Sequence, residues 1–141
     1  MILARTYWII VPILDGTKTQ TRRFLDPKLK IGSIQSLKRF PSDKTFAKVR
    51  IRNIRTEPLG AVTDADARAE GNADRADILR QICRSHANRG TLGKTPREWL
   101  QMLDDILSGR SKGPTVWVID FELVSVIWDP SKVVGHELRS V

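Results

Sequence analysis

The chain has 141 residues, of which 40% are hydrophobic, and this is enough for a single domain with a buried core. No apolar run is long enough to span a membrane and no signal segment opens the chain, so we expect a cytoplasmic protein without membrane contact. The single cysteine, Cys83, excludes an internal disulfide framework. With His86 and His136 it makes a poor ligand set, so the sequence predicts neither a metal site nor a cofactor.

The net charge of +8 arises in the N-terminal part of the chain. Residues 1–60 contain 13 lysines and arginines against four acidic residues, whereas residues 61–141 contain 11 against 12. Such an asymmetry indicates a polyanionic partner, and nucleic acid is the usual one in the cytoplasm. A basic membrane-surface helix fits less well, because the charges follow strand-like spacings.

The chain begins with two short apolar elements. Residues 1–5 predict a short strand, and the dense apolar stretch 7–15 predicts a buried helix that starts or bends at Pro12. Gly16 follows as a natural helix end.

The next run, residues 16–23, combines hydroxyl and cationic side chains without an acidic one. Its alternation over 17–21 predicts a short strand, with threonines on one face and Lys18, Gln20 and Arg22 on the other. Such faces suit an anionic ligand that accepts hydrogen bonds. The alternative is an edge strand whose cations face water and prevent aggregation.

Two further strands are predicted over 34–40 and 46–55. In the second, apolar residues alternate with three cations, so that one face is apolar and the other is positively charged. The cations are Lys48, Arg50 and Arg52. We expect them to contact an RNA backbone; the alternative is a solvated face without a ligand.

Helix signals follow these strands. Thr63 caps a predicted helix over 64–70, and Asp74 caps a second, longer one. Residues 95–98 begin a third helix with a Thr cap, a Pro at the first helical position and a capping Glu.

A final strand is predicted over 115–124. Its large apolar face consists of Trp117, Ile119, Phe121 and Leu123. We expect this face to line a barrel core together with Val49 and Ile51.

Four of these features, in this order, resemble the ASCH domain family of the PUA-like superfamily. They are the 16–23 run, the turn at Gly32-Ser33, the 63–71 run and the closing strand 116–122. The resemblance implies an α+β fold, a PUA-like small β-barrel with flanking helices. We expect one such domain over 1–124 and a C-terminal tail over 125–141; a helical insertion near 72–113 is where the chain departs from the smallest hydrolases of the family.

The family is associated with RNA, and one bacterial branch removes the acetyl group from N4-acetylcytidine. Resemblance to that branch implies a catalytic lysine at Lys18, a threonine nucleophile at Thr21 and a glutamate at Glu70. Arg22 or Arg23 would bind a phosphate. We therefore expect an amidohydrolase without a metal, acting on RNA or a modified nucleoside. Other members are RNA-binding modules without chemistry, or ribonucleases, and both alternatives stay open.

The residues themselves set conditions on this chemistry. Glu70 lies at the end of its predicted helix, where the dipole disfavours a carboxylate, so a cationic partner such as Lys18 is expected. Lys18 could act as a base on Thr21 with a lowered pKa, or it could stabilise an oxyanion while Glu70 carries the proton. Because Lys18 and Thr21 are three residues apart, they converge only across a bulge or bend of the strand.

Overall fold

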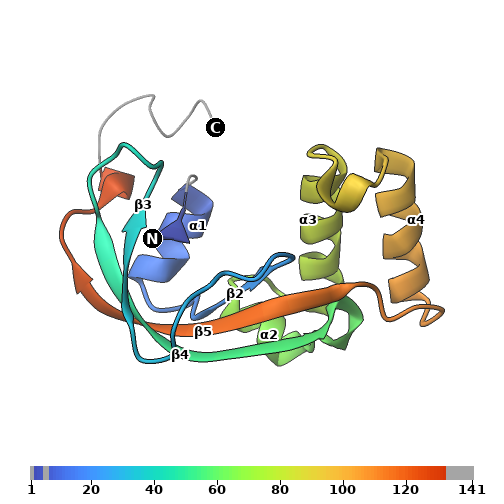
Figure 1. The fold of residues 1–141 in the computed structure, drawn as a ribbon, viewed down its shortest axis with the longest axis horizontal. Coiled ribbons are helices and arrows are strands. Elements are labelled where there is room, and N and C mark those ends of the chain that lie inside the picture. The colour runs from blue at the N-terminus through green and yellow to red at the C-terminus, as the bar shows by residue number, and fades with distance from the viewer. Residues whose placement is uncertain (1, 5–6, 133–141) are drawn as a thin grey trace.

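The computed structural model describes residues 2–4 and 7–132 and shows a curled sheet with helices at both ends (Figure 1). The strands are β1 (Ile2–Leu3), β2 (Gln20–Arg23), β3 (Ile34–Lys38), β4 (Ala47–Pro58) and β5 (Thr115–Val126). Their order is β1-β3-β4-β5-β2, and every pairing is antiparallel except that of β1 with β3. The long strands β4 and β5 form the central ribbon of this half-barrel.

Helices cover the two ends of the sheet in the described part of the chain. They are α1 (Tyr7–Leu14), α2 (Asp64–Ala69), α3 (Arg75–Ala87) and α4 (Pro96–Leu107), with 3₁₀ turns at Leu59–Ala61, Thr91–Gly93 and Pro130–Lys132. Figure 1 shows α1 at one end of the sheet and the α3–α4 pair at the other. The predicted α+β class, with a small barrel-like sheet and flanking helices, is confirmed.

Two apolar clusters stabilise these ends. The first joins α1 to the sheet, and its buried members include Ile10, Ile13, Leu37, Val49, Ile51, Ile119 and Phe121. The second surrounds α3 and α4, and its buried members include Leu59, Leu79, Trp99, Ile106, Val116 and Val118. Burial of this apolar area is the main favourable term in the stability of the fold.

Strand β5 contributes to both clusters, with opposite faces. Ile119 and Phe121 pack in the first cluster, whereas Val116 and Val118, which alternate with them along the strand, pack in the second. The predicted core positions of Ile119 and Phe121 are therefore confirmed, with Leu123 partly buried beside them. The prediction was wrong for Trp117, which is half-buried and belongs to neither cluster. Near the start of β5 the second cluster packs against Val116 and Val118, on the face opposite to Trp117.

The helix starts follow the predicted caps. Thr63 and Asp66 form a reciprocal capping box at α2, and Asp74 accepts a hydrogen bond from the backbone of α3. Thr95 and Glu98 form a second capping box at α4, with Pro at the first turn. Both boxes satisfy backbone N–H groups that a helix leaves unpaired at its start.

The predicted division into a domain over 1–124 and a tail over 125–141 stays a prediction. Strand β5 extends to Val126, and Pro130 is buried in the 3₁₀ turn that contacts α1. Residues 133–141 of the predicted tail lie outside the described residues.

Replacement of Thr95 by alanine should lower the free energy of unfolding by about 1 kcal/mol, because the cap of α4 is lost. Urea unfolding measures this change. Thr115→Ala, at the exposed start of β5, is a matched control that should change stability by less than about 0.5 kcal/mol. Equal losses in the two variants would contradict the assignment.

Candidate functional site

The site is built where the ends of α1 and α2 meet the start of β2. The backbone N–H of Lys18 donates to Pro12 O at 2.8 Å, and the N–H of Thr19 donates to Ala69 O at 2.7 Å. These bonds tie the segment before β2 to both helices. The strand begins at Gln20, whereas the sequence predicted a start at Thr17. Because Lys18 precedes the strand, strand alternation does not determine where its side chain points.

Lys18 and Glu70 form the ion pair that the helix-dipole argument predicts. Lys18 Nζ lies 3.6 Å from Glu70 Oε1, and the two side chains are only 12% and 7% exposed. The ammonium also donates to the backbone oxygens of Gln20, at 2.9 Å, and Glu70, at 3.4 Å. Glu70 occupies the C-cap of α2, so Lys18 supplies positive charge at the negative end of that helix.

Arg22 is a second cationic partner of Glu70, and its side chain is only 2% exposed. Its Nη1 donates to Glu70 Oε2 and, at 2.6 Å, to Gln20 Oε1, while its Nη2 donates to Glu57 Oε1 at 2.6 Å. Asp66 Oδ2 lies 3.5 Å from the same Nη2. Burial alone would lower the pKa of Arg22, but Glu70 and Glu57 outweigh this and raise it, so the guanidinium stays charged.

Thr21 and Arg23 point to the other face of β2. The hydroxyl of Thr21, which is 6% exposed as a residue, accepts a hydrogen bond from Arg23 Nη1 at 3.0 Å. Within the described residues no hydrogen bond joins Thr21 to Lys18 or Glu70. The predicted site residues are thus gathered around the start of β2 as two separate pairs, the Lys18–Glu70 ion pair and the hydrogen-bonded Thr21–Arg23 pair.

Burial and charge together decide the protonation of Lys18. Burial lowers its pKa, the carboxylate of Glu70 raises it, and Arg23 lowers it again; the net direction is downward. A lowered pKa makes a neutral amine more accessible, which is what a lysine base requires. Burial lowers the pKa of Arg23, Glu70 raises it and Arg89 lowers it, and the net direction is downward. These charged groups therefore share one electrostatic environment.

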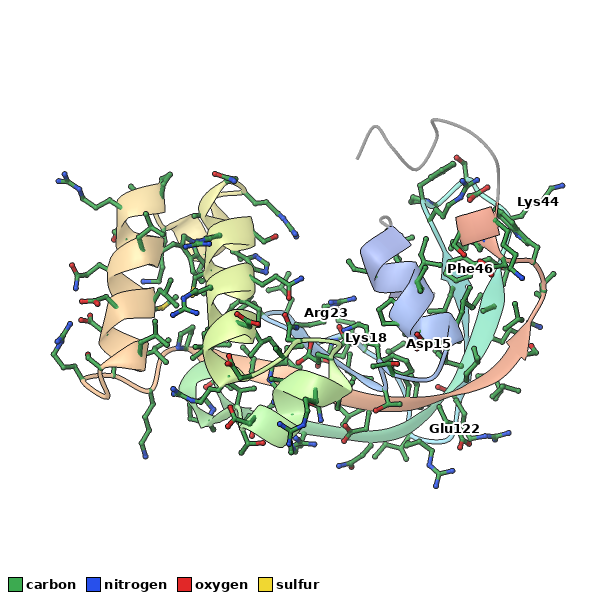
Figure 2. All side chains as sticks on the ribbon, turned by 180° about the vertical axis from the view of Figure 1, so that it is seen from behind. Asp15, Lys18, Arg23, Lys44, Phe46 and Glu122 are labelled. Atoms are coloured by element: carbon green, nitrogen blue, oxygen red, sulfur yellow. The ribbon has the colours of Figure 1, made fainter. Side chains whose placement is uncertain are left out.

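The five predicted phosphate-binding cations do not share a surface. Arg22 is buried in its cluster of carboxylates. Arg23 pairs with Trp117 of β5, and by strand alternation these two side chains lie on the face opposite to that of Glu122. Arg50 and Arg52 lie on the Glu122 face, where both guanidinium groups pair with that carboxylate at 3.4 and 3.0 Å. Figure 2 shows Lys18 and Arg23 on one side of the sheet and Glu122 on the other.

We call these two surfaces the inner face and the outer face. The inner face comprises Thr21, Arg23, Thr56, Trp117 and Ile119. The outer face comprises Lys48, Arg50, Arg52 and Glu122. The inner face is the side on which α1 packs.

Solved structures resemble this arrangement. The crystal structure of an ASCH domain from Lactobacillus crispatus JV V101 matches with a TM-score of 0.56 at 15% identity, over 86% of this chain and 76% of that chain. The crystal structure of protein EF3133 from Enterococcus faecalis V583, described as DUF984, matches with a TM-score of 0.57 at 15% identity, over 84% and 71%. No family model matches the sequence, and no curated protein is significantly similar to it. The chain has the ASCH fold.

Sequence reasoning missed part of the polar network that this ASCH-fold chain builds beneath α2. Gln20 Nε2 donates to Asp120 Oδ1 at 2.8 Å, and Arg55 Nη1 donates to Asp120 Oδ2 at 2.8 Å. Arg55 also lies 3.6 Å from Asp66 Oδ1, so α2 is held on the sheet by alternating charges. The polar residues Arg55 of β4 and Asp120 of β5 stand out in the sequence. Their hydrogen-bond partners are distant in sequence, so no local pattern predicts the network.

The described residues contain no group of three or more His, Cys, Asp or Glu side chains that could hold a metal ion. In the same part of this ASCH-fold chain, no helix is both long and apolar enough to cross a membrane.

Proposed function

We propose that this ASCH-fold protein binds RNA or a modified nucleoside and hydrolyses the amide bond of an acylated base such as N4-acetylcytidine. The observation that carries the proposal is the Lys18–Glu70 ion pair, which is buried directly beside the strand that holds Thr21. A lysine with a lowered pKa beside a carboxylate, with a threonine hydroxyl on the adjoining strand, supplies the groups that acyl transfer requires without a metal.

In the proposed reaction the hydroxyl oxygen of Thr21 adds to the acyl carbon, and its proton passes to a base. The C–N bond then breaks, and the leaving amine of the nucleobase receives that proton from the catalytic base. Water hydrolyses the resulting threonine ester to the carboxylic acid and restores the hydroxyl. Arg23, which donates to Thr21 Oγ1, orients the nucleophile.

Two groups are candidates for the proton transfer. Neutral Lys18 acts as the base if its lowered pKa leaves enough free amine; otherwise Glu70 carries the proton and the Lys18 ammonium stabilises the oxyanion. Glu70 Oε2 already accepts a hydrogen bond from Arg22 and Oε1 faces Lys18, so both carboxylate oxygens have cationic partners. We therefore assign the base to Lys18.

A second candidate function is an RNA-binding module without chemistry. It is favoured by the hydrogen bond from Arg23 to Thr21, because Thr21 bonds to neither Lys18 nor Glu70 within the described part of the chain. In this reading the Lys18–Glu70–Arg22 cluster only fastens α2 to the sheet, and the inner face binds RNA.

Incubation with N4-acetylcytidine, other N-acylated cytidines and short RNAs, read by mass spectrometry, separates these functions. The amidohydrolase releases the carboxylic acid and the free amine, and Lys18→Met abolishes this release. A ribonuclease shortens the RNA, and a binding module leaves every substrate intact while retaining RNA. Intact acylated cytidines with either of these last results would overturn the proposed chemistry.

The pH profile of Glu70→Gln identifies the base. The carboxylate of Glu70 raises the pKa of Lys18, so its removal should lower that pKa further. If neutral Lys18 is the base, activity rises with pH, and the rise should move to lower pH in Glu70→Gln. A loss of at least about 100-fold at every pH would instead assign the proton to Glu70.

Salt dependence distinguishes the two cationic faces. Arg23→Gln should reduce the log–log slope of RNA affinity against salt by about one unit, because one phosphate contact is lost. Arg50→Gln with Arg52→Gln should leave the slope unchanged, because Glu122 pairs with both guanidinium groups and the outer face lies away from Thr21. The reverse result would place RNA on the outer face.

A further inference from the structure

Trp117 is a large aromatic side chain that lies outside both apolar clusters of the fold. It is half-buried. In the described part of the chain its ring contacts no other ring, and its indole N–H donates to no group and is not buried. Core tryptophans behave differently: Trp99 is fully buried and donates to Thr91 O at 3.1 Å.

The neighbours of Trp117 are polar and cationic. Trp117 pairs with Arg23 on β2 and with Thr56 on β4, so the three side chains form one row across the inner face. Arg23 and Thr56 are both exposed. The Arg89 side chain, which follows α3 and is exposed, adds positive charge near Arg23.

We propose that Trp117 is the stacking platform for the base of a bound nucleotide, with Arg23 and Arg89 supplying the positive charge for its phosphate. The inference rests on the proposed function and names the subsite that holds the base. An indole beside guanidinium groups is the combination that binds single-stranded nucleic acid, because every base offers an aromatic face and every nucleotide a negative charge. The indole N–H is free to donate to a ribose or base oxygen.

The register places this platform beside the proposed nucleophile. Thr21 pairs with Ile119, so Trp117 is its diagonal neighbour on the adjacent strand. Diagonal neighbours on one face of a sheet lie about 7–8 Å apart. A pyrimidine stacked on Trp117 therefore lies within reach of Thr21, so that its exocyclic acyl group can approach the hydroxyl for attack.

Binding of a fluorescent single-stranded RNA and of 5′-CMP tests the platform. Trp117→Leu should weaken the affinity about 5- to 150-fold, the range that loss of one base–aromatic stack produces, whereas Trp117→Phe should retain most of it. The salt slope should be unchanged in Trp117→Leu, because no charge is removed. A merely structural effect would instead lower thermal stability and weaken both variants alike.

A second readout does not depend on the stability of a variant or on hydrolysis. In ¹H–¹⁵N spectra, 5′-CMP should move the indole resonance of Trp117, identified by its absence in Trp117→Phe, and leave that of the buried Trp99 in place. Movement of other resonances without that of Trp117 overturns the platform, as does no movement at all. Release of acid from N4-acetylcytidine in the product assay then shows separately whether the proposed function survives.

Discussion

Lys18→Met should lower the turnover of an acylated cytidine by at least about 100-fold, the scale of a lost acid–base or oxyanion partner. The side chain is only 12% exposed and pairs with Glu70, so methionine fills its space but can neither take a proton nor stabilise an anion. Steady-state release of the carboxylic acid measures the effect.

The same variant should stay folded, which separates a catalytic role from a structural one. Burial of Lys18 lowers its pKa, a sign that the surroundings disfavour the charged form. Glu70 keeps Arg22 as a partner after the change, so no carboxylate is left unpaired. Lys30→Met, at an exposed position, is the matched control and should retain full turnover. A folded Lys18→Met variant with full turnover would contradict the catalytic assignment.

Arg22→Met should lower the free energy of unfolding by about 3–5 kcal/mol, the range for breaking a buried ion pair by removing one partner. The guanidinium bridges Glu57, Asp66 and Glu70, which come from β4 and α2. Its loss leaves these carboxylates close together with less compensation, so α2 should loosen from the sheet. Denaturant unfolding measures the loss.

Arg52→Met provides the matched control, because that side chain is 60% exposed and pairs with Glu122 at the surface. It should change stability by less than about 1 kcal/mol. Adding Glu57→Gln to Arg22→Met should recover part of the loss, because it removes one of the uncompensated charges. If Arg22→Met and Arg52→Met were equally stable, the buried cluster would not be what holds α2.

Local chemistry was sufficient to predict most elements of the fold. The capping boxes at Thr63 and Thr95 and the alternation in β4 depend on residues a few positions apart, so they can be read from the chain. The expected pairing of Glu70 with a cation was also predictable, because it follows from the position of a carboxylate at a helix end.

Tertiary structure decided which charges are available to a ligand. Arg22 and Arg23 are neighbours in sequence, yet β-strand geometry points one into the carboxylates beneath α2 and the other to the inner face. Trp117 was expected in the core because its strand face is apolar, but only Ile119, Phe121 and Leu123 of that face pack in the cluster around α1. Which part of a face a helix covers depends on contacts between distant segments, and no local pattern contains them.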